Sequence, residues 1–292
     1  MKNAIFLAVA LALGTGAVLP AEAATQGNVR AVRATAQADM VLTGSIDISA
    51  AGRVDAYRLD HAEKVPGYVQ DYLRPIIAAW RFDPTITAGR PVAVTAPLSL
   101  RLTGRPLADG GWEMTLADAG FRSYDKDDLT ELASLEMRPP SYPDEISKAG
   151  GTGEVMVLLQ VDRNGAVTDA IAERVDLTVV ARERVMQQFR DGLAKASLQA
   201  ARKWTFRVPT EGPHQDAEGW TARVPVSFAI EGLGVRREAR YGQWRAYIPG
   251  PRQRAPWHEG EDDTMQGGML PDQGVFLAGV QKGPKLLTPV GG

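Results

Sequence analysis

The sequence predicts a mixed arrangement of strands and helices in which one small module occurs twice. A Trp-x-Phe pair at Trp80 returns at Trp204, and each pair stands ahead of a strand-like stretch, 96–100 in the first copy and 224–228 in the second. Residues 42–48 alternate apolar and polar residues with a period of two, which suits a half-buried strand, and Val155, Val157, Leu159 and Val161 fall on the equivalent positions of the second copy. An internal repeat constrains the architecture before any single element is assigned. Two related modules are therefore expected.

The chain begins with features of a secretory signal peptide. Lys2 precedes an apolar run at 4–13, and Ala21 and Ala23 provide an A-x-A cleavage site. We expect a signal peptide over residues 1–23, cleaved after Ala23, and a linker over 24–37. An uncleaved inner-membrane anchor is the alternative, but glycines interrupt the stretch, which falls short of the roughly 20 apolar residues of a spanning helix.

The first module is expected over residues 38–107. Its first strand at 42–48 turns at Gly52, and a return strand begins at Val54. A helix should precede Trp80, either starting near Pro75 or kinked there, because proline removes a helical hydrogen bond. A closing strand is expected at about 93–102, after which residues 108–137 should form a linker.

The second module is expected over residues 138–231. Its hairpin matches the first without a gap when Gly165 is set on Gly52, and Asn164 followed by Gly165 is a strong hairpin signal. Apolar residues from Leu193 to Ala201 at helical spacing predict a helix, and a closing strand should cover about 222–231. Each closing strand carries a proline, Pro97 or Pro225, which favours a sheet edge for part of its length.

The remainder, residues 232–292, is rich in glycine and proline. It predicts a mostly disordered tail, in which Val275 to Leu277 and Leu286 to Leu287 are the candidates for docking onto a module.

Composition argues against several classes of function. A formal net charge of −2 gives no global basic surface, so nucleic acid is not expected as a partner. The chain has no cysteine, which excludes disulfides, thiolate catalysis and thiolate metal sites. Its three histidines lie in separate loops or the tail, and no nucleophile elbow, P-loop or zinc-protease helix occurs. We therefore expect no enzyme activity, cofactor or metal, and interpret the acidic run at 258–263 as a solvated patch.

Five features in order carry a family resemblance. They are Tyr142-Pro143, a short helix ending in glycines, a hairpin from Gly153 through Gly165, a helix running into Trp204 and Phe206, and a last strand from Val224 to Ile230. Over about residues 139–231 they resemble the TonB C-terminal domain family, and residues 38–104 look like a diverged copy without the Tyr-Pro lead-in. The resemblance implies an α+β fold in which each module is a small antiparallel sheet with helices packed on one face.

The same resemblance implies a binding function in the periplasm. In the family, an edge strand pairs with an extended segment of an outer-membrane receptor in energy-coupled transport. This is β-augmentation, in which main-chain hydrogen bonds supply affinity. The protein or peptide partner is then expected at the following partner-binding residues: Tyr142, Pro143, Arg223, Val224, Pro225, Val226, Ser227, Phe228, Ala229 and Ile230.

One departure from the family favours an exported binding protein over a force transmitter. No proline occurs between Pro20 and Pro66, so a stiff proline-rich spacer is missing. Membrane contact is then expected to be peripheral or absent once the leader is cleaved. The alternatives are a structural or envelope-assembly protein whose two modules pack on each other and use up their edges, and an envelope hydrolase without a recognisable motif.

Overall fold

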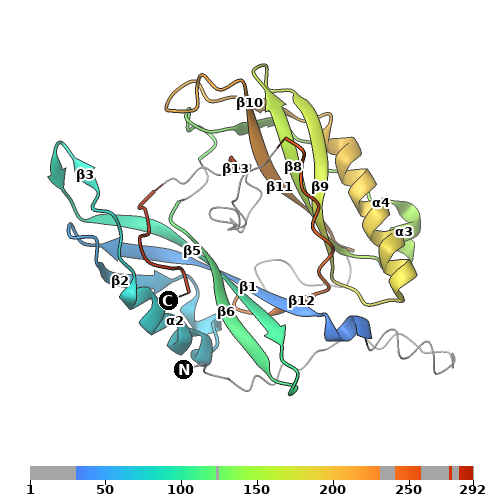
Figure 1. Ribbon diagram of the computed structural model, residues 1–292, viewed down its shortest axis with the longest axis horizontal. Helices are drawn as coiled ribbons and strands as arrows, with labels where there is room; N and C mark the ends of the chain where they lie inside the picture. The colour runs from blue at the N-terminus through green and yellow to red at the C-terminus, as the bar shows by residue number, and fades with distance from the viewer. Residues whose placement is uncertain (1–30, 123–124, 231–240, 258–275, 278–282, 292) are drawn as a thin grey trace.

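The computed structural model describes residues 31–122, 125–230, 241–257, 276–277 and 283–291. It contains two main antiparallel sheets with a helix on one face of each, which confirms the predicted α+β class (Figure 1). The leader at 1–23 and the acidic run at 258–263 lie outside the described residues. Within them, no helix has the length and apolar character needed to cross a membrane.

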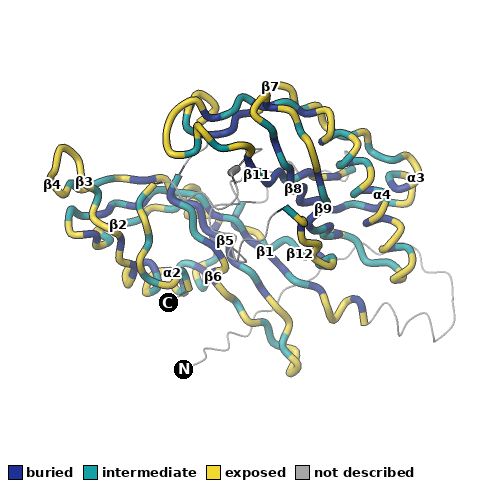
Figure 2. Tube along the Cα trace, turned by 45° about the horizontal axis from the view of Figure 1, so that its top comes forward, coloured by how far each residue is buried: buried dark blue, intermediate teal, exposed yellow. Residues whose placement is uncertain are grey.

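The first sheet is built around the long strand β1. Its strands are β1 (Gln37–Ile48), β2 (Val54–Leu59), β5 (Val94–Pro106), β6 (Trp112–Gly120) and β12 (Arg245–Tyr247). Strands β2 and β12 share one side of β1, β5 pairs with the other side, and β6 lies beyond β5. A short exposed hairpin, β3 (Ile86–Thr87) and β4 (Arg90–Pro91), projects from this half of the molecule (Figure 2).

Helix α2 (Gly67–Ala79) follows the 3₁₀ turn η1 (Ala62–Lys64) and packs on the first sheet. Its residues Val69, Leu73 and Ile77 are fully buried at a spacing of four, so they form one apolar stripe. The helix begins well before Pro75, so the alternative in which it starts near that proline is wrong. Burial of the stripe on both sides of Pro75 offsets the hydrogen bond that the proline removes.

The second sheet has the strand order β13-β11-β8-β9. Its strands are β8 (Gly153–Asp162), β9 (Val167–Leu177), β11 (Gly219–Phe228) and β13 (Phe276–Leu277). Helix α4 (Glu183–Ala201) covers one face, and the short α3 (Asp144–Lys148) lies beside it (Figure 1). Helix α4 starts before the predicted stretch, because Met186 and Phe189 extend its buried stripe.

The two hairpins have the same register. Ile46 pairs with Tyr57 in the first, and Leu159 pairs with Ala170 in the second, a constant offset of 113 residues. Each first strand also has a register shift at the equivalent place, just before Ile48 in one hairpin and just before Val161 in the other. The gapless alignment of Gly165 on Gly52 therefore holds in three dimensions.

The closing strands follow a different alignment from the one that the sequence suggests. Ala96 pairs with Ile46, and Ala222 pairs with the equivalent Leu159, so Ala96 corresponds to Ala222 rather than to Val224. The motifs around the two prolines are therefore two residues out of structural register. Sheet pairing rather than proline position determines which residues are equivalent.

Two segments predicted to be linkers contribute to the sheets and cores. The stretch 108–137 contains β6 and a strand β7 (Ala133–Glu136), which pairs with β10 (Thr205–Arg207). Within the stretch 24–37, Val32 and Ala36 are buried in the core of the second sheet. The alternation of apolar residues through Trp112, Met114 and Leu116 was the overlooked signal for β6, because this spacing places them on one face.

Helices α2 and α4 lie on the far sides of the molecule, so the sheet faces they leave uncovered are turned toward each other (Figure 1). A segment from the predicted tail joins these sheets. Arg245 to Tyr247 form β12 on the edge of the first sheet, and the next residue, Ile248, pairs with Leu177 at the edge of β9. The two sheets are therefore tied by one continuous stretch of backbone.

Candidate functional site

Strand β11 provides the predicted partner-binding edge. On one side it pairs with β8 along its whole length. On its other side it pairs with β13 at Ala222 and Arg223. That pairing ends there, and Val224 to Val226 meet no further strand of the described chain on this side. Within the described residues, the edge for which the sequence predicts peptide capture is therefore paired in part.

The side chains of the predicted site point to both faces of β11. Val224, Val226 and Phe228 are buried in the core beneath α4, so at these positions only the backbone can face a visiting strand. Ser227 is exposed and Pro225 is half-buried on the opposite face. The last two predicted residues, Ala229 and Ile230, follow the end of the strand.

Arg223 belongs to a buried ion cluster on the uncovered face of the second sheet. Its guanidinium donates to both carboxylate oxygens of Glu173, at 3.0 and 3.3 Å. Arg252 donates to the same carboxylate at 2.8 and 3.1 Å. Burial by itself would raise the pKa of Glu173, but the hydrogen bonds and charges of the two arginines outweigh it and hold that pKa below its ordinary value. Arg223 is therefore engaged within the fold.

Tyr142 and Pro143 lie at the entry to α3. The Tyr142 hydroxyl donates to the carbonyl oxygen of Gly151 at 2.6 Å, and its ring packs edge-on against Phe228 with centroids 5.2 Å apart. Burial raises the pKa of the Tyr142 hydroxyl. Pro143 is the residue that precedes the first turn of α3. The structure thus brings Tyr142 to the end of β11 but leaves Arg223 at a different part of the strand.

The opposite edge of the second sheet is taken by the chain itself. Ile248 and Leu177 exchange two backbone hydrogen bonds, of 2.7 and 3.0 Å, and the amide of Gln253 donates to the carbonyl of Glu173 at 2.7 Å. Between them, a Cβ at Gly250 would lie 2.2 Å from the carbonyl oxygen of Val175, so only glycine permits this approach. Strand β9 therefore offers no comparable edge over these residues.

The corresponding edge of the first sheet is also covered. Residues 99–102 of β5, which correspond to 225–228 of β11, pair with β6. Pro97 precedes this paired stretch and faces only β1 within the ladder. Among the residues that the structure describes, β11 is thus the closing strand whose outer edge is paired only in part.

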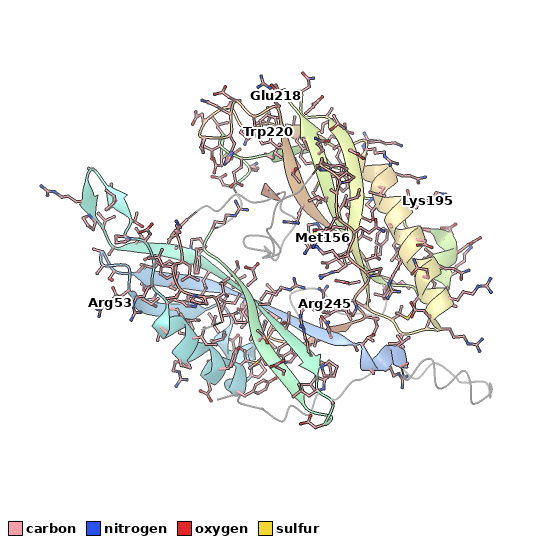
Figure 3. All side chains as sticks on the ribbon, in the orientation of Figure 1. Arg53, Met156, Lys195, Glu218, Trp220 and Arg245 are labelled. Atoms are coloured by element: carbon pink, nitrogen blue, oxygen red, sulfur yellow. The ribbon has the colours of Figure 1, made fainter. Side chains whose placement is uncertain are left out.

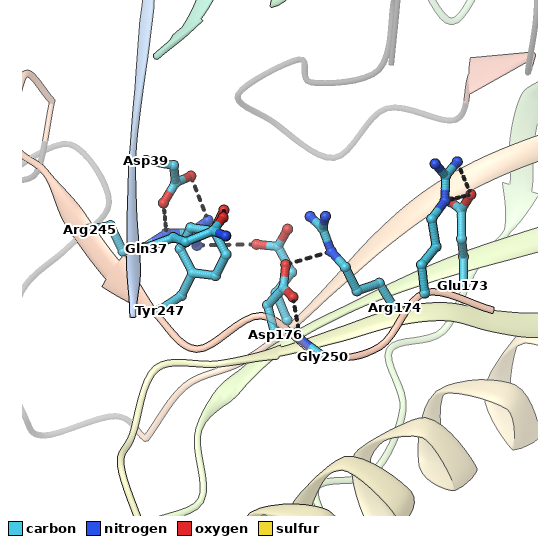
Figure 4. Close-up of polar contacts among 10 residues, drawn as sticks. Gln37, Asp39, Glu173, Arg174, Asp176, Arg245, Tyr247 and Gly250 are labelled. Carbon is cyan, nitrogen blue, oxygen red and sulfur yellow. Dashed lines mark hydrogen bonds and ion pairs between the residues drawn. The ribbon is translucent and has the colours of Figure 1, made fainter. Parts of the chain in front are cut away.

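Charged residues fill the space between the two uncovered sheet faces (Figure 4). Arg245 of β12 donates to both oxygens of Asp39 at 3.0 Å and to Glu154 of β8 at 3.2 Å. Burial by itself would lower the pKa of Arg245, but these carboxylates raise it. Arg174 pairs with Asp176 at 2.9 Å, and burial raises the pKa of Asp176 despite that partner. Arg245, which contacts both Asp39 of β1 and Glu154 of β8, thus links the first sheet to the second.

Figure 3 places the labelled side chains relative to this space. Met156 and Arg245 lie between the two halves, whereas Lys195 projects from the outer surface of α4. In the part of the chain that the structure describes, no three histidine or acidic side chains gather as a metal site would require.

A small sheet in which β11 returns to pair with β8, beneath helix α4, defines the second half as a compact α+β module. Comparison with known proteins adds a relationship. The chain is similar to the proteins TonB of two Xanthomonas campestris pv. campestris strains, B100 and ATCC 33913, with 38% identity over 100 residues in each case. The match covers 34% of this chain and 39% of each relative. The chain thus contains a region like the TonB C-terminal domain.

The other comparisons give no match: no family model and no solved structure matches this chain.

Proposed function

We propose that this chain is a non-enzymatic, exported TonB-like binding protein that takes part in energy-coupled outer-membrane transport. Its second module captures an extended segment of an outer-membrane receptor by strand pairing along β11. The similarity to TonB proteins supports the transport role. Within the described residues, this edge of β11 is paired only at Ala222 and Arg223, and that supports the peptide-capture step, because backbone groups at a sheet edge are a template for another strand.

The composition of this edge fits backbone recognition. Val224 and Val226 direct their side chains into the core, so their contribution to a visiting strand is restricted to main-chain hydrogen bonds. Side-chain selectivity then falls to groups on the opposite face, where Ser227 is exposed.

Site-directed cross-linking tests this proposal cleanly because the chain has no native cysteine. We expect Ser227→Cys to form disulfides with receptor-derived N-terminal peptides that carry a cysteine. Yields should alternate as the peptide cysteine is moved one residue at a time, because strand side chains alternate between faces. Lys195→Cys, on the exposed surface of α4, is the matched control and should give only background yields.

The peptide itself supplies a second control. N-methylation of alternate peptide amides keeps every side chain but removes backbone donors. Two such peptides exist, one methylated at odd positions and one at even positions, and one of the two should no longer bind. Equal cross-linking at residues 227 and 195 would rule out capture by strand pairing. Binding of both methylated peptides would rule it out as well.

A second candidate is a structural envelope protein whose modules pack on each other. The contact that favours it is the segment around Tyr247 and Ile248, which pairs with both sheets. Hydrogen exchange separates the two functions. The informative amides of β11 are those beyond Arg223 that face away from β8. A structural role predicts that they are protected without any peptide, whereas peptide capture predicts that their protection appears only when the peptide is added.

A further inference from the structure

Among the described residues, the C-terminal segment, residues 283–291, occupies at the first sheet the place that the lead-in segment, residues 134–138, has at the second sheet. In the second half, Ser134 of β7 pairs with Phe206, and the carbonyl of Arg138 accepts the indole N–H of Trp204 at 2.8 Å. In the first half, Leu286 pairs with Phe82, and the carbonyl of Val290 accepts the indole N–H of Trp80 at 3.1 Å. These are the equivalent contacts.

The spacing of these contacts is the same in both halves. The residue that accepts the indole proton comes four positions after the residue that pairs with phenylalanine, Arg138 after Ser134 and Val290 after Leu286. The two segments therefore run in the same direction past the same Trp-x-Phe motif. The chain completes its first module with its own C-terminal segment.

Several contacts hold the C-terminal segment. The amide of Leu287 donates to the carbonyl of Arg81 at 2.8 Å, and the amide of Asp83 donates to the carbonyl of Lys285 at 2.9 Å. Leu286 and Val290 pack against the core of the first sheet, whereas Leu287 is 56% exposed. The segment thus alternates between core and solvent as an added strand does.

The strand on the β11 edge belongs to the same stretch of chain. Phe276 and Leu277 of β13 pair with Arg223 and Ala222, and residues 278–284 separate them from Lys285. A connection of that length reaches at most about 29 Å. So short a tether gives an attached strand an effective concentration on the order of millimolar, which allows even a two-residue pairing to persist.

We propose that the first module serves as the anchor for the C-terminal segment and thereby holds β13 on the β11 edge as a tethered competitor of the receptor peptide. This inference rests on the proposed function, because the competitor occupies the edge assigned to peptide capture. Receptor binding then requires displacement of β13, and the anchor sets how readily this happens.

Two neighbouring residues supply a matched pair of variants. Leu286→Asp places a charge against the first core and should release the C-terminal segment, whereas Leu287→Asp changes a side chain that already faces solvent. Of the neighbouring residues Ala222 and Arg223, one points its amide toward β13 and the other toward β8, because successive amides of a strand alternate in direction. In the peptide-free protein, the amide that faces β13 should lose exchange protection in Leu286→Asp and keep it in Leu287→Asp. Equal protection in both variants would overturn the anchoring role.

A second variant tests competition without disturbing the anchor. Phe276→Pro combined with Leu277→Pro removes the backbone donors of β13 and leaves residues 283–291 intact. It should bind the receptor peptide at least about tenfold more tightly than the natural chain, as should Leu286→Asp. Unchanged affinity in the double-proline variant would overturn the competitor role.

The two measurements keep the inference separate from the proposed function. If no variant binds a receptor peptide, peptide capture at β11 is wrong, and the competitor role fails with it. The exchange of the β11 amide that faces β13 still determines whether the first module anchors the strand.

Discussion

Gly165 and Phe206 are in direct backbone contact. The amide of Phe206 donates to the carbonyl of Gly165 at 2.8 Å, and a Cβ on Gly165 would lie 1.8 Å from the carbonyl oxygen of Phe206. Gly52 and Phe82 repeat the same contact in the first half, with a hydrogen bond of 2.8 Å and a Cβ approach of 2.0 Å. In each half, the glycine of the hairpin turn thus contacts the phenylalanine of the Trp-x-Phe motif that follows the helix.

Alanine at either turn should therefore destabilise the protein strongly. Both glycines have positive φ, +74° at Gly52 and +78° at Gly165, and the clash is with backbone atoms that cannot rotate away. We expect Gly165→Ala to cost about 3 kcal/mol or more of unfolding free energy, from left-handed strain and displaced backbone together. Gly67→Ala, at a position with open space and ordinary φ, is the control for chemical denaturation and should change stability by less than about 1 kcal/mol. A small loss at Gly165 would contradict this contact.

Removal of the charge on Glu173 should lower the free energy of unfolding, because this carboxylate neutralises a buried arginine. The facing side chains of Glu173 and Arg223 are only 7% and 9% exposed, so Glu173→Gln leaves a buried arginine without its counter-charge. We expect a loss of about 3 kcal/mol in urea unfolding. Asp71→Asn breaks an exposed pair with Arg74 and should change stability by less than about 1 kcal/mol.

The same carboxylate predicts a pH dependence. Its pKa in the folded state lies below the ordinary value of 4.5, so the unfolded chain binds the proton more readily. The stabilisation is therefore complete above about pH 4.5 and is lost as the pH falls through the folded pKa. Measured from pH 7 down to pH 3, the natural chain should lose more stability than Glu173→Gln. If the stability of the two proteins fell equally with pH, the assigned pairing of Glu173 with the two arginines would be contradicted.

The sequence predicted local elements well because their determinants are local. Asn164 and Gly165 determine a turn within a few residues, and the period-two alternation at 42–48 determines which face of the first hairpin is buried. The α+β class and the TonB-like region follow from these elements in order. Nothing in such patterns specifies the partner of a strand at long range.

The remaining features depend on contacts between distant parts of the chain. The pairing of Leu286 with Phe82 and of Phe276 with Arg223 brings the C-terminal end onto both sheets, although its glycines and prolines predict disorder. Glu173 was missed as a partner of Arg223 because the two lie 50 residues apart and meet only when β11 returns beside β8. The order of the strands, rather than composition, creates these contacts.

Tyr142 should prove to support the fold more than to bind a peptide. Tyr142→Phe keeps the ring against Phe228 and removes the hydrogen bond to Gly151, so we expect a loss of about 1 kcal/mol in stability. Peptide affinity should change by less than about twofold. Tyr142→Ala also removes the ring and should cost about 3 kcal/mol. A tenfold loss of peptide affinity in Tyr142→Phe, with stability preserved, would instead assign the hydroxyl to the partner.

Processing of the N-terminus bears directly on how the protein works. Cleavage after Ala23 is predicted by the charged residue Lys2, the apolar run at 4–13 and the A-x-A site. The exported protein should therefore begin at Ala24. Intact-mass spectrometry of protein released from the periplasm measures this end. Ala21→Leu with Ala23→Leu blocks the small-residue site and should leave a heavier, membrane-retained form. Membrane retention of the natural chain with residues 1–23 still attached would favour a tethered transducer, because only an anchored module can transmit force from the inner membrane.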